Sequence, residues 1–147
     1  MKRIRHKLGI HKGGRGHFGI VELEAELLPQ QIEVTGDLSI PEDWPQDWIW
    51  SIDLEWARSA FAGADFAAQN LVDRGMIHGC RVCVKVIEGH VFHTNTEDFW
   101  CAAAMAVFKA FLPEDKLPAY RWENNLWHFV FPDQTWNQGF TSPARKL

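Results

Sequence analysis

The chain has 147 residues, of which 46% are hydrophobic and 23% charged, with a formal net charge of −4. This length is enough for one domain with a core, and no apolar run approaches the roughly 20 residues of a membrane-spanning helix. The three cysteines are an odd number, and the basic start of the chain has no apolar stretch behind it, so it is not a secretory signal. We therefore expect a cytoplasmic protein with reduced thiols and no membrane partner.

Charge is distributed unevenly along the chain. Residues 1–17 contain no acidic residue, whereas residues 22–73 contain one basic residue, Arg58. The basic residues of the first segment are Lys2, Arg3, Arg5, Lys7, Lys12 and Arg15. We predict a basic arm over residues 1–12, one domain over 13–132 and an irregular tail over 133–147. The arm meets a polyanion, is a disordered segment that only aids solubility, or folds back onto its own acidic body, and the charges alone leave these readings open.

The first predicted element follows the glycine-rich stretch GGRGHFG at residues 13–19. Apolar and acidic residues alternate from Ile20 to Leu28, which predicts a half-buried strand that Pro29 ends. A weaker alternation at Ile32 and Val34 predicts a second strand. The short connection between the two indicates an antiparallel hairpin.

Two helical segments are predicted next. Apolar residues four apart from Trp48 to Phe61 indicate one helical face, with Asp47 as its cap. Gly63 breaks or kinks this helix, and the helical pattern then resumes and ends at Gly75. Tryptophan on more than one face of this helix suggests two packing surfaces, one of which could serve a homodimer.

A strand over residues 80–88 is predicted by CRVCVKVIE, with Val82, Val84 and Val86 on one face and Ile87 on the other. Thr94 and Glu97 fit a capping box before a buried, alanine-rich helix over about 96–112. A small strand pair then turns at Asn124–Asn125. This order of elements predicts an α+β fold, a mixed sheet of about four strands with two helices on one face.

The glycines at 14–19 also match the pattern G-x-G-x-x-G of dinucleotide-binding proteins. That pattern binds a pyrophosphate only when a strand precedes it and a helix follows it. Here a strand follows, and no G-x-x-x-x-G-K-[ST] motif occurs in the chain. We therefore expect no nucleotide and no cofactor.

Cysteine and histidine spacing raises the question of a metal site, because Cys80-x-x-Cys83 is followed by His90-x-x-His93. Positions three apart on a strand face opposite sides, which argues against a shared ion. Cys101 lies in the apolar helix and is expected in the core. Two glycine-containing loops carry four histidines, His11, His17, His90 and His93. They leave an acid–base enzyme open as an alternative. No nucleophile is evident, and we assign no catalytic residue.

Three stretches together resemble domain IV of translation elongation factor G. They are HKGGRGHFGIVELEAELLP, DLSIPEDW and the segment from Gly75 to Phe111, in the order that this family has them, so the resemblance covers about residues 11–112. It implies a left-handed βαβ crossover and a common tip formed by the glycine loop and the loop over 89–96. The chain has no GTP-binding domain, its second loop is shorter than in the family, and residues 113–147 match nothing in it.

The resemblance implies a non-catalytic module that binds ribosomal or other structured RNA through the two tip loops. Glycine-rich backbone can approach phosphates, Arg15 can pair with a phosphate, and His17 and Phe18 can stack on bases. The expected RNA-binding residues are Lys12, Gly13, Gly14, Arg15, Gly16, His17, Phe18, His90, His93 and Asn95. A protein-interaction module that uses a tryptophan-rich surface is the first alternative, and a histidine-dependent enzyme, metal-assisted or not, is the second.

Overall fold

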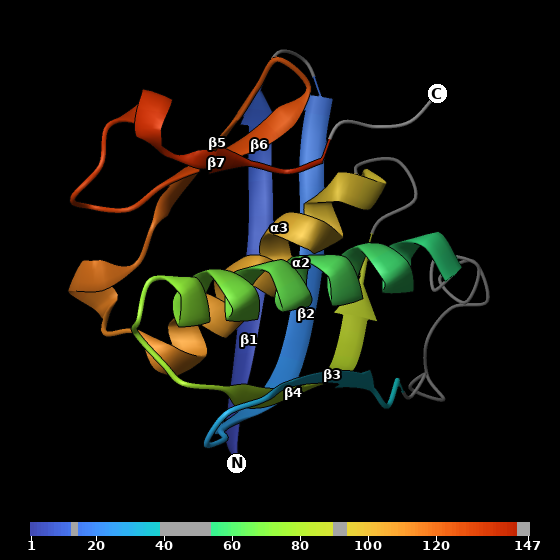
Figure 1. Ribbon diagram of the computed structural model, residues 1–147. Helices are drawn as coiled ribbons and strands as arrows, with labels where there is room; N and C mark the ends of the chain where they lie inside the picture. Colours follow the sequence, from blue (N-terminus) through green and yellow to red (C-terminus); the bar gives the residue numbers. More distant parts are fainter. Residues whose placement is uncertain (13–14, 39–53, 90–93, 144–147) are drawn as a thin grey trace.

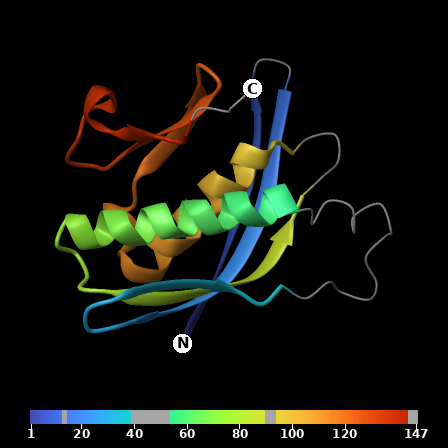
Figure 2. The ribbon, with the colours of Figure 1, turned by 45° about the vertical axis from the view of Figure 1, so that its right-hand side comes forward.

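The computed structural model describes residues 1–12, 15–38, 54–89 and 94–143. A four-stranded sheet in the order β1-β2-β4-β3 carries helices α2 and α3 on one face, and a smaller sheet in the order β5-β6-β7 lies across one end of it (Figures 1 and 2). The predicted α+β class, with a mixed sheet and two covering helices, is confirmed.

Residues predicted as a basic arm form a strand instead. β1 (Lys2–Lys12) pairs antiparallel along its whole length with β2 (Arg15–Leu27), from Lys2 opposite Ala25 to Lys12 opposite Arg15. The segment therefore folds back onto its own acidic body, and contact of its cations with a polyanion stays a prediction. Its inner face is apolar at alternate positions, with Leu8 fully buried and Ile4 and Ile10 packed against the core. Basic residues alternate with these on the other, exposed face, at Arg3, Arg5 and Lys7.

The predicted antiparallel pairing of the second and third strands is wrong. β4 (Cys80–Glu88) lies between β2 and β3 (Ile32–Gly36), antiparallel to the first and parallel to the second. The start of β4 bonds to both neighbours, since Leu28 N–H donates to the Gly79 carbonyl at 3.0 Å and Cys80 N–H donates to the Gln31 carbonyl at 2.9 Å. A side chain at Gly79 would lie 2.6 Å from the Gln31 nitrogen, so this insertion requires glycine.

A bulge in β4 corrects the predicted facing of its last valine. Glu22 lies opposite Val86 and Leu23 opposite Val84, so Lys85 is an additional residue on β4. Two residues on one strand facing one on the other shift the alternation by one position. Val86 is therefore only half-buried, and Ile87 is 1% exposed.

Helix α2 (Leu54–Asp73) runs without interruption through Gly63. The expected break is absent because Gly63 lies where α2 crosses α3 (Thr96–Phe111), and a side chain there would lie 2.8 Å from the Trp100 Cα. Small residues on both helices form the contact. Residues 39–53, which include the predicted cap Asp47 and Trp48, lie outside the described residues.

Helix α3 confirms the predicted buried, alanine-rich helix, with Cys101 in the core. Its N-cap is Asn95 rather than Thr94, and the carboxylate that reaches back to the cap belongs to Asp98. The predicted box at Thr94 and Glu97 is therefore displaced by one residue. Thr94 Oγ1 instead donates to the Phe18 carbonyl at 2.7 Å.

The C-terminal residues form a small sheet on α3. After a single 3₁₀ turn, η1 (Glu114–Lys116), the strands β5 (Ala119–Glu123) and β6 (Leu126–Val130) pair as predicted. The predicted irregular tail contains a second 3₁₀ turn, η2 (Trp136–Gln138), and β7 (Phe140–Thr141), which pairs with β6. Ser142 continues the pairing, because its N–H donates to the Trp127 carbonyl at 2.8 Å.

Candidate functional site

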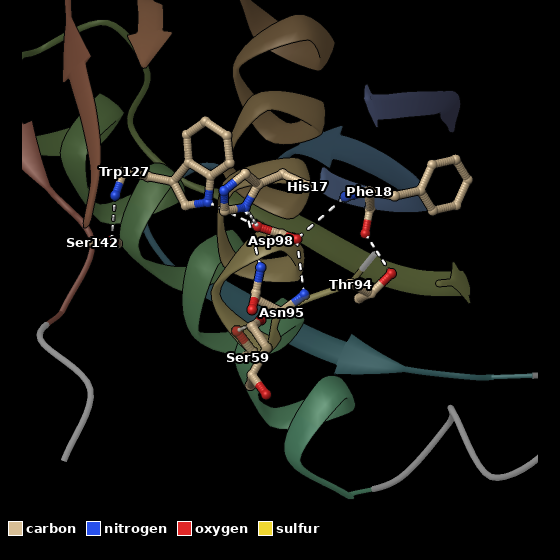
Figure 3. A network of polar contacts seen from close by, with 9 residues as sticks. His17, Phe18, Ser59, Thr94, Asn95, Asp98, Trp127 and Ser142 are labelled. Atoms are coloured by element: carbon tan, nitrogen blue, oxygen red, sulfur yellow. Dashed lines mark hydrogen bonds and ion pairs between the residues drawn. The ribbon is translucent and has the colours of Figure 1, made fainter. Parts of the chain in front are cut away.

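A buried carboxylate lies where β2, α3 and β6 meet. Asp98 is 0% exposed and accepts three N–H groups, from the Asn95 backbone at 2.9 Å, the Phe18 backbone at 3.3 Å and the Trp127 indole at 3.2 Å (Figure 3). His17 Nδ1 lies 2.9 Å from Asp98 Oδ1. One side chain thus connects the first turn of α3 to the second strand and to the C-terminal sheet.

His17 lies on the inner face of β2, enclosed by aromatic rings. Its ring centroid is 4.4 Å from that of Trp122 and 5.3 Å from that of Trp127. The side chain is 1% exposed, and Nε2 has no hydrogen-bond partner among the described residues. Stacking of His17 on bases, as expected from the sequence, needs an exposed ring, whereas period-two alternation turns His17 toward the core together with Val21 and Leu23.

A histidine and an aspartate at hydrogen-bond distance have the geometry of an acid–base pair. Burial raises the pKa of the Asp98 carboxyl, and the hydrogen bonds from Asn95, His17 and Trp127 oppose that rise. A catalytic pair must reach a substrate, but these two side chains are 1% and 0% exposed. The network therefore acts as a structural connection in this conformation.

The two tip segments of the resemblance do meet in space. The Phe18 carbonyl accepts from Thr94 Oγ1, and the Asn95 amide nitrogen lies 3.2 Å from His17 Nδ1. The predicted neighbourhood of the glycine stretch and the segment before α3 is confirmed for these residues. Contact with RNA at any of them stays a prediction.

The other predicted RNA-binding residues fall into two groups. Lys12 and Arg15 are the last and first residues of β1 and β2 and lie opposite each other, while Gly16 and Phe18 follow in β2, both half-buried. Gly13, Gly14, His90 and His93 lie outside the described residues. The histidine cluster proposed for an enzyme is thus described only at His17, which is buried, and at His11, which lies in β1.

Cys80 and Cys83 face opposite sides of β4, as predicted. Cys80 lies in the core, where burial raises its pKa to about 11, and Cys83 lies half-buried on the other face. Within the described ranges, no group of three His, Cys, Asp or Glu side chains is placed to hold a metal ion.

Ion pairs lie on the sheet face away from the helices, in the half that holds the start of β1 and the end of β2. Arg3 Nε lies 2.8 Å from Glu22, and Arg5 lies 3.7 Å from Glu88. Across β4, Arg81 contacts Glu26 at 2.6 Å and Glu33 at 2.7 Å. Exposed pairs of this kind each contribute little to stability, but they neutralise the cations that they contain.

The half of the β1–β2 hairpin next to its turn contains basic residues and no carboxylate of its own. Arg5 and Glu22 occupy opposite positions on β1 and β2. Between there and the turn, residues 7–20 contain Lys7, Lys12 and Arg15 and no carboxylate. Lys7 Nζ lies 5.8 Å from the centroid of the Phe18 ring. The strand register therefore concentrates positive charge in the half of the hairpin next to its turn.

His6 is a second buried histidine, on the inner face of β1. Its Nε2 lies 3.0 Å from the Tyr120 hydroxyl, and Nδ1 has no hydrogen-bond partner among the described residues. Burial lowers the pKa of His6 from 6.5 to about 4, and the Lys109 ammonium adds to this lowering. The neutral ring is the form that fits between β1 and β5.

Acid should destabilise the protein through His6. The unfolded chain binds a proton at His6 near pH 6.5 and the folded chain only near pH 4, so stability present above pH 6.5 is lost as the pH falls through 4. The expected contribution is up to about 1.4 kcal/mol per pH unit. Urea unfolding of the protein and of His6→Gln at several pH values should give a flatter profile for the variant; equal profiles would assign the pH dependence to another group.

Comparison with known proteins gives a likeness of fold. No protein-family model matches the chain, and no curated protein matches it. It is similar to the crystal structure of ttk003000868 from Thermus thermophilus, with a TM-score of 0.54 and 19% sequence identity. The likeness covers 73% of this chain and 15% of the Thermus chain. Among the described residues, no helix is long and apolar enough to span a membrane. At this identity the likeness shows only that most of this chain shares the fold of the matched part of the Thermus chain.

Proposed function

We propose that the chain is a non-catalytic module that binds structured RNA, with ribosomal RNA as the first candidate, through the turn end of the β1–β2 hairpin. The observation that carries the proposal is the charge distribution set by the strand register. Arg3 and Arg5 near the start of β1 are paired with carboxylates, and the cations near the turn lie in a segment that contains no carboxylate. An unbalanced group of cations at one end of a molecule attracts a polyanion.

The resemblance to domain IV of elongation factor G supports RNA contact at the same end of the molecule. The resemblance attributes RNA contact to the glycine stretch and to the loop before the second helix, and their flanking residues are in contact here at Phe18 and Thr94. Because His17 is buried, we assign it to holding this end together rather than to base stacking. Phosphate contact falls to Lys12 and Arg15, with Lys7 behind them.

Salt dependence of RNA binding tests the proposal. We expect fluorescence anisotropy with a labelled RNA stem–loop to show affinity that falls steeply between about 50 and 200 mM salt. Lys12→Ala should weaken binding and reduce the slope of log K against log salt by about 1. Arg5→Ala removes an equal charge from the paired half and should leave that slope unchanged.

Two outcomes would contradict the proposal. One is undetectable binding of the stem–loop and of purified ribosomes at about 50 mM salt, a condition that favours electrostatic contacts. The other is an equal loss of affinity in Lys12→Ala and Arg5→Ala, which would show that net charge alone attracts the RNA. The first outcome would favour the protein-interaction alternative.

A further inference from the structure

The β5–β6 hairpin points toward the same end of the molecule as the β1–β2 hairpin. Tyr120 of β5 contacts His6, which pairs with Val21 low in the β1–β2 hairpin. Two residues later, Trp122 contacts His17, which pairs with Ile10 nearer the turn. β5 therefore advances toward the turn end of β1 and β2. In Figures 1 and 2 the β5–β6 connection reaches the end where β1 finishes and β2 begins.

Asn124 and Arg15 lie at a similar distance along their strands from the contact between Trp122 and His17. Asn124 follows Trp122 by two residues, and Arg15 precedes His17 by two residues. Each strand rises about 3.3 Å per residue, so Asn124 and Arg15 each lie about 7 Å beyond the contact between Trp122 and His17. Strand pairing continues to the turn, with Glu123 opposite Leu126.

Two asparagines form the β5–β6 turn, and both have positive φ angles. Asn124 has φ 54° and Asn125 φ 60°, the conformation of a two-residue type I′ turn, and both residues are exposed. Glycine would satisfy this backbone equally well, but asparagine adds two side-chain amides at the end of the molecule. The neighbouring Glu123 carboxylate lies 2.9 Å from Arg121 Nε, so its charge is compensated.

We propose that Asn124 and Asn125 contact unpaired bases of the RNA whose phosphates the β1–β2 hairpin binds. This inference rests on the proposed function and specifies its substrate as RNA with a single-stranded loop. A side-chain amide carries a donor and an acceptor side by side and matches the edge of an unstacked base. The hairpin cations supply the part of binding that does not depend on base identity. The β5–β6 hairpin, which belongs to the segment that matches nothing in the resembled family, thereby extends the RNA site.

A double variant that keeps the turn tests this assignment. Asn124→Gly with Asn125→Gly preserves a backbone that tolerates positive φ and removes both amides. Anisotropy is measured with two labelled RNAs of equal length, a stem with an unpaired loop and a blunt duplex. Asn137→Ala, which removes an exposed amide from η2, is the matched control.

The natural protein should prefer the looped RNA, and the double variant should lose about tenfold in affinity for it, the effect of one good base contact. Affinity for the duplex, the salt slope and the thermal unfolding midpoint should stay unchanged. Asn137→Ala, which loses the hydrogen bond from Thr135 Oγ1, should keep both RNA affinities and the salt slope. Equal affinity of the double variant and the natural protein for looped RNA would overturn the inference and leave the proposed function standing. Absence of binding to either RNA by the natural protein would overturn both.

Discussion

Asp98→Ala should lower the free energy of unfolding by about 3–5 kcal/mol, the range for breaking a buried charged network. The substitution removes the acceptor of three N–H groups and the partner of His17 Nδ1, all of them in the interior. Donors left buried without an acceptor retain the cost of leaving water. Urea unfolding followed by far-UV circular dichroism measures the change.

Two variants calibrate the result for Asp98. Asp98→Asn keeps the size of the side chain and one acceptor oxygen, and it should lose about half as much as alanine, since its amide group meets donors on one side. Asp115→Ala changes an exposed aspartate in η1 and should stay within about 0.5 kcal/mol of the natural protein. A loss below about 1 kcal/mol in Asp98→Ala would show that the three segments are held together by apolar packing alone.

Gly63→Ala should destabilise the protein by about 3 kcal/mol, the upper end of the usual cost of overpacking. Helix propensity alone favours alanine over glycine by about 1 kcal/mol, so the expected sign is opposite to that of an ordinary helical position. The added methyl group would collide with the backbone of α3, at the Trp100 oxygen and 2.8 Å from its Cα. Backbone in the middle of a buried helix cannot move aside as a flexible side chain does.

Ala62→Gly is the paired control, because Ala62 precedes Gly63 in α2 and is exposed. It should cost about 1 kcal/mol through propensity. Thermal or urea unfolding of both variants therefore separates packing from propensity. Stabilisation by Gly63→Ala would mean that the two helices have room to separate, contrary to the contact at Trp100.

Local sequence patterns predicted the helices, strands and turns that depend on residues close together in the chain. Alternation gave β2 and β4, the alanine-rich run gave α3, and the two asparagines gave the turn between β5 and β6. The same alternation is present in β1, at Ile4, His6, Leu8 and Ile10, but polar His6 on the inner face conceals it. The inward position of His6 can be recognised only once its hydrogen-bond partner, Tyr120, is known.

Contacts between distant segments could not be predicted in this way. The insertion of β4 between β2 and β3 depends on a pairing across about fifty residues, for which a single sequence carries no signal. Asp98 looked like an ordinary acidic residue in the first turn of a helix. Its role depends on Trp127 and His17, which lie 29 and 81 residues away along the chain. The burial of His17, in contrast, follows the local period-two alternation of β2 that it shares with Val21 and Leu23.

The position of β1 at the border of its sheet also bears on self-association. Among the described strands β1 has a neighbour on one side only, and its 11 residues offer a long row of backbone groups to another chain. A second copy approaching antiparallel along this border would bring Arg3, Arg5 and Lys7 against the same residues of its twin. Like charges facing each other across a two-fold axis discourage such pairing. We therefore expect the sequence of β1, which contains several basic residues and no carboxylate, to disfavour pairing of a second copy along this edge.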